Sequence, residues 1–396
     1  MKMYDLIVVG GGPAGAATAQ YVHKQGKRVL LLEKSNFPRF QIGESLLPFS
    51  MEVFEDLGFD KVLASGNYLK KKGALFIDSR QGDSIYFDFS DGGKAAYPHA
   101  YEVQRAQFDH DFLNHAIKAG VEVHQPEEFC DLEINLEGVM VTTDKGQYRS
   151  KFIVDATGGK SQILRKFESK EKNELYYNNF SIYAHFEGVS RDNLRDRGDI
   201  TIGILHDNSW AWLIPFEDGS TSVGIVSSRT NLPEISDPEG AFTAIIDKNS
   251  WLSELMSSAN RSSEFKVVSN YSYKCDSFVG ERWGSVGDSM SFLDPVFSSG
   301  VHVSLMSAKL LSQNIVYSLE NEGCWLNSED NVVSYNAEIK KGITRFNNLL
   351  QMFYGGDFLN RVKSLEKRDG TRSAITAAIA GGVWCEDNIL IRMGLI

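Results

Sequence analysis

The sequence predicts an α/β protein in which a domain built on a βαβ unit is joined to a mostly antiparallel β-sheet domain and a short helical C-terminal region. Three observations support this fold class. A glycine-rich turn joins an apolar strand to a helix within the first 25 residues. Residues 75–101 and 178–273 contain runs that alternate apolar and polar side chains, as half-buried strands do. Residues 327–354 have the spacing of one long helix, and shorter helices follow to residue 396.

Composition limits what the chain can do. Its 396 residues exceed what one hydrophobic core normally organises, so two joined domains are expected. The formal net charge of −11 disfavours nucleic acids and anionic membranes as partners. The most apolar stretch, 374–383, is much shorter than the roughly 20 residues of a membrane-spanning helix, so no transmembrane segment is expected. The four cysteines form no CxxC pair, which predicts a reduced, cytoplasmic protein without a cysteine metal site: Cys130, Cys275, Cys324 and Cys385.

The N-terminal segment has the order strand, glycine turn, helix, strand and acid. Residues 4–9 form a predicted buried strand, 10–15 the glycine turn, 16–25 a helix and 28–32 a second strand. This order is that of a Rossmann-type dinucleotide-binding unit. A glycine pattern alone is weak evidence, but its position between a strand and a helix strengthens it.

Each glycine of this turn has its own expected task. Gly10 permits the tight turn, Gly12 lets backbone N–H groups approach a pyrophosphate, and Gly15 lets the helix pack on the sheet. Glu33 ends the second strand, where an acid accepts hydrogen bonds from a ribose. With Ala14 beside them, these residues form the predicted dinucleotide site. The pattern by itself does not separate FAD from NAD.

Three later segments distinguish the two cofactors. Arg105 opens a predicted helix, from which an arginine can reach a cofactor phosphate. Residues 154–159 form a strand that ends in a small-residue turn. Residues 284–288 form a strand that delivers an acid, and a helix then follows from 300 to about 319.

In this order the segments resemble the FAD-binding fold of the para-hydroxybenzoate hydroxylase type, over most of residues 1–320. The resemblance implies that Asp288 holds the ribityl–phosphate part of FAD, and that the helix after Gly300 points its N-terminus at the flavin ring. The remaining cofactor contacts that it implies come from Gly43, Ser45, Arg105, Asp155, Gly158, Pro295 and Val301.

The sequence contains a single dinucleotide fingerprint. No second GxGxxG is present that would form a nicotinamide-binding domain. Electrons are therefore expected from transiently bound NAD(P)H or from a separate NAD(P)H-dependent flavin reductase, which would supply the FAD in reduced form.

Two tryptophans stand two residues apart, in the run Trp210-Ala211-Trp212-Leu213-Ile214-Pro215. Residues i and i+2 of a strand point to the same face, so both indoles are expected to project side by side, with Pro215 stopping the strand. Core packing alone could explain the pair. The alternative is a wide apolar wall beside the cofactor.

This Trp-x-Trp-x-Ile-Pro motif occurs with three others: a Gly-Glu-Ser-Leu-Leu-Pro segment at 43–48, a triple lysine leading into the strand Gly73-Ala74-Leu75-Phe76, and the turn at 293–301. Together they resemble the flavin-dependent halogenases, and the phenol/pyrrole branch more than the tryptophan branch. The resemblance implies a two-component enzyme that uses reduced FAD, O₂, and chloride or bromide. A flavin C4a-hydroperoxide would be attacked by halide to give hypohalous acid.

The resemblance assigns the handling of hypohalous acid to a lysine, and Lys71 is the match. Strand alternation sends Lys71 to the face opposite Lys70 and Lys72. A solvated run of charges before a strand is the alternative explanation. On the catalytic interpretation Trp210 and Trp212 separate the flavin from the substrate, so that halide and not substrate meets the peroxide.

Halide is expected on backbone N–H groups near Ser299 and Gly300, because a glycine-containing turn at a helix N-terminus binds anions. An ordinary N-cap by Ser298 or Ser299 is the alternative, and both can hold at once. Tryptophan halogenases carry a glutamate at the position of Phe297. Its replacement predicts a phenol or pyrrole substrate, either free or tethered to an acyl or peptidyl carrier protein.

The expected domains are discontinuous. The FAD-binding domain comprises 1–74, 102–177 and 274–325, the substrate domain 75–101 and 178–273, and the helical C-terminal region 326–396. Two other functions remain open from the sequence. One is an FAD-dependent monooxygenase or a geranylgeranyl-reductase-like oxidoreductase on the same fold, and the other is a non-catalytic flavoprotein.

Overall fold

The computed structural model describes residues 2–396, except 94–96, 173–178, 192–193, 195–197, 207–208, 229–236, 270–272, 322 and 367–369. The predicted domain boundary at 177–178 touches the second of these gaps. The description below applies to the remaining residues.

The first sheet carries the glycine turn. Its order is β7-β2-β1-β10-β9-β8, with β19 also paired to β10. The neighbours β7, β2, β1, β10 and β19 are parallel, and the β8–β9 hairpin extends the sheet in antiparallel fashion. The strands are β1 (Met3–Val9), β2 (Val29–Leu32), β7 (Glu122–His124), β8 (Phe129–Asn135), β9 (Gly138–Thr143), β10 (Gln147–Asp155) and β19 (Trp283–Ser285).

Three helices pack together beside this sheet. Helix α1 (Pro13–Lys24) contacts both α4 (Arg105–Lys118) and α8 (Ser299–Glu320). Helix α1 begins three residues earlier than the sequence suggested, because Pro13 is already suited to the first helical position. The shorter helices of this half are α2 (Met51–Leu57), α3 (Asp60–Ser65) and α5 (Leu164–Phe167). A small ribbon pairs β11 (Glu171–Lys172) with β18 (Tyr273–Lys274).

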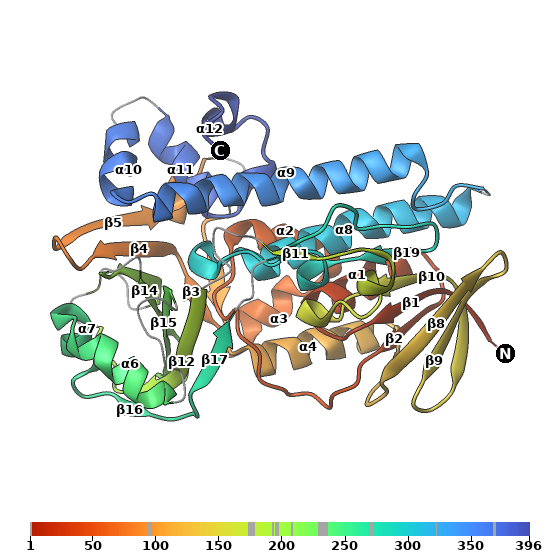
Figure 1. Ribbon diagram of the computed structural model, residues 1–396, viewed down its shortest axis with the longest axis horizontal. Helices are drawn as coiled ribbons and strands as arrows, with labels where there is room; N and C mark the ends of the chain where they lie inside the picture. The colour runs from red at the N-terminus through yellow and green to blue at the C-terminus, as the bar shows by residue number, and fades with distance from the viewer. Residues whose placement is uncertain are drawn as a thin grey trace.

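The second sheet carries the tryptophan motif and lies beside the first (Figure 1). Its order is β16-β12-β15-β14-β13-β4-β5, with β17 also paired to β12, and only the β13–β4 pair is parallel among these strands. The strands are β4 (Gly73–Asp78), β5 (Asp83–Asp88), β12 (Asn179–Glu187), β13 (Ile200–Ile204), β14 (Trp210–Pro215), β15 (Thr221–Ser228), β16 (Asn260–Arg261) and β17 (Lys266–Ser269).

One face of this second sheet is covered by two helices that the sequence patterns did not predict. Helices α6 (Pro238–Asp247) and α7 (Ser250–Met256) pack on the face that carries Ala211 and Leu213. The opposite face, with the two tryptophans, belongs to a separate core. Strand alternation therefore divides the residues of β14 between two environments.

A short two-stranded ribbon joins the two halves. Strand β3 (Leu69–Lys71) pairs antiparallel with β6 (Ala100–Glu102), so that Lys71 lies opposite Ala100. On its other side β6 contacts the Gly-Glu-Ser segment through a bridge between Ser45 and Glu102. This ribbon brings the lysine strand next to the segment at 43–48.

The C-terminal region consists of helices that cover both halves. Helix α9 (Glu329–Tyr354) runs along α8 and extends to the region above β5 (Figure 1). Helices α10 (Phe358–Glu366), α11 (Thr371–Ile379) and α12 (Ile389–Arg392) follow. Within the described part of the chain, no helix combines the length and hydrophobicity that crossing a bilayer requires.

Candidate active site

A cavity of about 630 Å³ lies between the glycine turn and the tryptophan face of the second sheet. Most of the site residues expected from the sequence line it: Gly10, Gly12, Ala14, Glu33, Gly43, Ser45, Arg105, Gly158, Trp210, Trp212, Asp288, Pro295, Ser299, Gly300 and Val301. Five others lie outside its lining: Gly15, Lys71, Asp155, Pro215 and Phe297. The cavity thus gathers residues from the whole length of the first 300 positions.

Close packing of the backbone requires glycine at two positions of the turn, Gly10 and Gly15. Gly10 has φ +112°, and a Cβ there would lie 2.2 Å from the carbonyl oxygen of Ala156. A Cβ on Gly15 would lie 1.9 Å from the carbonyl oxygen of Gly10. Gly12 is different, because the nearest atom to its ideal Cβ is an Arg39 nitrogen at 3.6 Å. The open side at Gly12 leaves room for a ligand at the N-terminus of α1.

We expect the Gly15→Ala variant to be purified without flavin. Its methyl group would displace the backbone of Gly10, so both the turn and the packing of α1 are lost, at a cost of about 1–3 kcal/mol or more. Gly146→Ala is the matched control, because no atom lies within 4 Å of its ideal Cβ and its φ is not positive. Absorbance of bound flavin after purification measures the effect. Full flavin occupancy in Gly15→Ala would contradict it.

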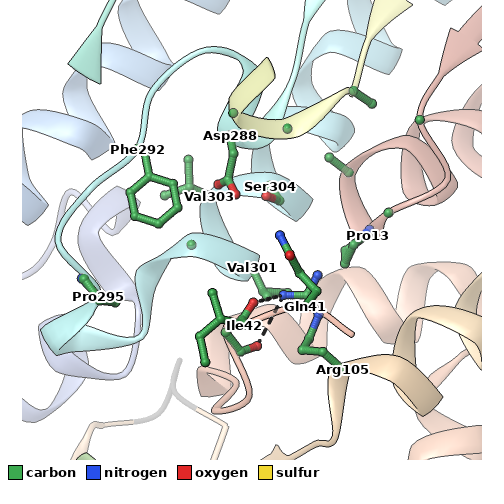
Figure 2. Close-up of a pocket in the computed structure, with 18 of the residues that line it drawn as sticks. Pro13, Gln41, Ile42, Arg105, Asp288, Phe292, Pro295, Val301, Val303 and Ser304 are labelled. Atoms are coloured by element: carbon green, nitrogen blue, oxygen red, sulfur yellow. Dashed lines mark hydrogen bonds between the residues drawn. The ribbon is translucent and has the colours of Figure 1, made fainter. Parts of the chain in front are cut away.

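Arg105 is held rigidly at the cavity wall. Its Nε and Nη2 donate to the two carboxylate oxygens of Asp109 at 2.7 and 3.1 Å, and its Nη1 donates to the carbonyl of Ile42 at 2.6 Å. Figure 2 shows Arg105 and Gln41 on one side of the cavity, with Asp288 and Ser304 on the other. Asp109 uses the bidentate edge of the fixed guanidinium, so a ligand phosphate would meet its remaining N–H groups.

Asp288 lies in a 3₁₀ turn (Gly287–Ser289) that follows β19, and not in the strand that the sequence suggested. Gly287 has φ +63°, which ends the extended conformation. Burial raises the pKa of Asp288 to about 6, although Arg105 and Lys170 oppose the rise. A carboxyl group in this state suits hydrogen bonding to ligand hydroxyl groups, as a ribityl chain offers.

Glu33 and Asp155 both organise backbone turns. Glu33 accepts hydrogen bonds from the N–H of Gly11 at 2.7 Å and of Ser35 at 2.8 Å, while it also lines the cavity. The carboxylate of Asp155 accepts from Thr157 and from the N–H groups of residues 163 and 164. Asp155 therefore stabilises the backbone of the small-residue turn that lines the cavity, without lining the cavity itself.

The turn before α8 presents free backbone donors. Ser298 adopts a left-handed conformation (φ 56°, ψ 28°), and no side chain caps the helix that begins at Ser299. The N-cap alternative considered from the sequence is therefore wrong for Ser298. The residues 298–301 line the cavity, so the first N–H groups of α8 face a space where an anion can bind.

The two tryptophans form one wall of the cavity. Their ring centroids are 5.8 Å apart with an interplanar angle of 48°, and both side chains are buried. The ring of Trp212 lies so close to β15 that a Cβ on Gly224 would be 2.1 Å from it. The prediction that both indoles share one face is confirmed, and Pro215 is the last residue of β14 as expected.

A hydrogen-bond network that the sequence analysis missed anchors this wall. The indole N–H of Trp210 donates to the hydroxyl of Tyr354 at 2.9 Å, and that hydroxyl donates to Asp294 at 2.9 Å. The tyrosine lies at the end of α9, about 140 residues away in sequence. No local pattern signals such a contact, because it depends on where α9 crosses the second sheet.

Lys71 is completely enclosed, while Lys70 and Lys72 are exposed, as strand alternation predicted. Its ammonium nitrogen donates to the hydroxyl of Ser45 at 2.9 Å and to the carbonyl of Leu46 at 3.0 Å. It also lies 5.3 Å from the ring centroid of Phe89. Ser45 lines the cavity and Lys71 does not, so the lysine sits directly behind Ser45.

Burial lowers the pKa of Lys71, and Glu102 and Asp199 oppose this change. Burial disfavours the charged form of an ammonium group, and buried lysines with shifted pKa values are often found at functional sites. The sequence analysis missed Glu102, because a single glutamate in a short strand has no distinguishing pattern.

Phe297 belongs to an aromatic cluster next to the cavity. Its ring centroid lies 6.0 Å from that of Phe76 and 6.1 Å from those of Phe353 and Phe358. The glutamate found at this position in tryptophan halogenases would have to be buried among these rings.

The residues around the cavity fit FAD. Uncapped N–H groups at the start of α1, the open side of Gly12 and the fixed Arg105 suit the pyrophosphate, and Glu33 suits the adenosine ribose. Asp288 lines the same cavity and would hold the ribityl hydroxyl groups. When bound, FAD supplies redox chemistry that no side chain provides.

Comparisons with known proteins agree with this geometry. A family model described as an FAD binding domain matches residues 3–324. A 1H-pyrrole-2-carbonyl-(peptidyl-carrier protein) chlorinase of Pseudomonas fluorescens is 28% identical over 379 residues, covering 89% of this chain and 83% of the relative. The structure of the flavin-dependent brominase Bmp2 superposes with a TM-score of 0.89 at 25% identity, covering 100% of this chain and 98% of the brominase.

A further solved structure is that of the myxobacterial chondrochloren halogenase CndH, an FAD-dependent halogenase. It superposes with a TM-score of 0.82 at 33% identity, covering 89% of this chain and 83% of that protein. The glycine turn, the cavity and the extent of these matches lead to one conclusion. The chain is an FAD-dependent oxidoreductase that belongs to the flavin-dependent halogenases.

Proposed function

We propose that this chain halogenates an electron-rich aromatic compound, a phenol or a pyrrole, with reduced FAD, O₂, and chloride or bromide. One observation carries the proposal. The cofactor cavity is walled by Trp210 and Trp212, and a fully buried lysine lies just outside it behind Ser45. This arrangement supports an oxidant that forms in the cavity and is used at a separate, neighbouring position.

Reduced FAD, when bound, supplies the chemistry by which O₂ and halide give hypohalous acid. The protein contributes the halide position, since the N–H groups of Ser299 and Gly300 at the start of α8 face the cavity without a cap. The indoles of Trp210 and Trp212 exclude an aromatic substrate from the flavin. Halide is small enough to reach the flavin.

Lys71 then holds the oxidant next to the substrate. As an ammonium it donates a hydrogen bond to the oxygen of hypohalous acid, and this polarises the oxygen–halogen bond for attack by the ring. Ser45 already accepts from Lys71 and is the gate between cavity and lysine. In a site without water such a charged donor acts more strongly than it does in solution.

The aromatic residues near Lys71 and Phe297 support this substrate class. The ammonium nitrogen of Lys71 lies 5.3 Å from the ring centroid of Phe89. The ring centroid of Phe76 lies 5.6 Å from that of Phe87 and 6.0 Å from that of Phe297. These rings place no carboxylate at position 297, where tryptophan halogenases carry a glutamate that assists ring deprotonation. A phenol or pyrrole ring is electron-rich enough to react without that assistance.

The form of the substrate and the source of electrons belong to the same proposal. The name of the Pseudomonas fluorescens relative describes a pyrrole-2-carbonyl group on a peptidyl carrier protein, and we infer that this chain also accepts a ring tethered to a carrier. A separate NAD(P)H-dependent flavin reductase delivers reduced FAD, which is consistent with the single dinucleotide fingerprint.

The deciding assay combines the purified chain with FAD, NADH, a flavin reductase, O₂, and chloride or bromide. Phenols and pyrroles are offered both free and as thioesters on a carrier protein, and products are identified by mass spectrometry. The expected product exchanges a hydrogen for a halogen. A gain of oxygen would instead identify a monooxygenase, and reduction of an added prenyl compound a reductase. Flavin released on denaturation confirms that the cofactor was bound.

A further inference from the structure

A second buried ionisable group lies beside Lys71 and has no assigned task. The side chain of Glu102 is 1% exposed, and within the described part of the chain neither of its oxygens has a partner at full hydrogen-bond geometry. A buried carboxyl group that is not fully hydrogen-bonded is unfavourable in its ionised form. Such a group is unusual enough to suggest a function.

The backbone holds Glu102 between the lysine strand and the Gly-Glu-Ser segment. Strand β6 pairs with β3 on one side, where Glu102 is opposite Leu69, and bridges to Ser45 on the other. Lys71 reaches over β6 to donate to the Ser45 hydroxyl at 2.9 Å. Because that hydroxyl accepts from Lys71, its own hydrogen is free to point towards Glu102.

Burial favours the protonated form of Glu102, against the two positive charges near it. Burial raises its pKa to about 8, and Lys71, Ser45 and Arg191 only partly oppose the rise, while Asp199 adds to it. Asp199 accepts hydrogen bonds from the N–H groups of Lys72 and Gly73. Near neutral pH the group next to the lysine is therefore a carboxylic acid that can give up a proton.

We propose that Glu102 is the proton partner of Lys71, exchanging a proton with it through the Ser45 hydroxyl during halogen transfer. This inference rests on the proposed function of Lys71. Glu102 acts through Lys71 and touches neither the halogen nor the ring. It would supply an acid to a site that has none at Phe297.

The proton balance closes over one cycle. The oxygen–halogen bond of hypohalous acid breaks as the carbon–halogen bond forms, and the departing hydroxide takes a proton from Lys71 and leaves as water. Glu102 passes its proton through Ser45 to the resulting amine. The ring carbon then loses its proton, which the Glu102 carboxylate recovers along the same chain. An aromatic C–H and hypohalous acid give an aryl halide and water, and both residues return to their initial state.

The test compares the wild type with Glu102→Gln, which has a similar shape but no transferable proton, and with Glu102→Asp. The measured quantity is the ratio of halogenated product to flavin reoxidised, from pH 6 to pH 9. This ratio removes any effect of a variant on the rate of flavin reoxidation. In the wild type this yield falls as pH rises through about 8, because Glu102 loses its proton. In Glu102→Gln we expect a yield lower by roughly 10²-fold and no decline near pH 8. Glu102→Asp restores part of the yield and retains a decline.

Thermal unfolding of the same FAD-loaded proteins gives a readout independent of activity. The folded-state pKa of Glu102 lies above its ordinary value of 4.5, so its contribution to stability is complete below about pH 4.5 and is lost as pH rises towards 8. The Tm of Glu102→Gln minus that of the wild type should therefore become more positive from pH 5 to pH 9.

Three results would overturn the inference. A yield reduced equally at every pH, with the wild-type profile retained, would assign Glu102 a purely structural role. An unchanged yield would remove it from the reaction, and a Tm difference independent of pH would show that its carboxyl group titrates normally. Absence of halogenated product from the wild type would instead contradict the proposed function and with it this role. The pH dependence of the Tm difference would still show whether Glu102 is a buried acid with a raised pKa.

Discussion

Replacing Lys71 by methionine is expected to reduce halogenated product by about 10²–10⁴-fold while flavin reoxidation by O₂ continues at the wild-type rate. Lys71 does not line the cofactor cavity, so its loss leaves FAD binding intact. Methionine has a similar volume and removes an ammonium group whose burial is unfavourable, so the fold should tolerate it. The measured quantities are halogenated product by mass spectrometry and NADH consumption in the same reaction.

The same strand offers a matched control. Lys70 precedes Lys71 but is exposed on the opposite face, so Lys70→Met changes the charge of the ribbon without touching the site. We expect this variant to form product at the wild-type rate. Equal product formation by Lys71→Met and Lys70→Met would remove Lys71 from the mechanism, even if the enzyme halogenates.

Trp212→Ala is expected to uncouple the reaction. Removing this indole opens the wall between cavity and substrate, so hypohalous acid escapes or the substrate reaches the flavin. The indole also packs against Tyr183 and Trp210 at ring distances of 5.7 and 5.8 Å, and its loss should cost about 3–5 kcal/mol of stability. The readouts are free hypohalous acid, captured by a soluble trap, and oxygenated product, both relative to NADH consumed.

The opposite face of the same sheet provides the control for lost packing. Trp251, on α7, lies against Gly203, which pairs with Ala211 between the two wall tryptophans. Trp251→Ala should destabilise the sheet to a comparable degree without increasing trapped oxidant. If both variants leak oxidant equally, the leak reflects general loosening of the sheet, and Trp212 is not a divider.

Several elements were predictable because they depend on neighbours in the sequence. The βαβ unit follows from an apolar strand, a glycine turn and an amphipathic helix in order, and the structure shows β1, α1 and β2 within three residues of the expected bounds. Alternation along β3 and β14 similarly predicted the enclosed Lys71 and the paired indoles. Helices α6 and α7 were missed although Ala241, Phe242, Ile245 and Ile246 repeat with helical spacing, because they interrupt a region patterned mainly as strands.

The sequence by itself determined the cofactor site and the chemistry-bearing motifs, since each lies within one strand–turn or turn–helix segment whose residue spacing specifies which side chains share a face. Only the tertiary structure decided how these motifs work together. The β3–β6 pairing put Glu102 next to Lys71 and Ser45, and the crossing of α9 put Tyr354 on Trp210. Such contacts join positions from about 30 to about 140 residues apart. They depend on how whole elements pack, and this information is distributed over the entire core and is not carried by any local pattern.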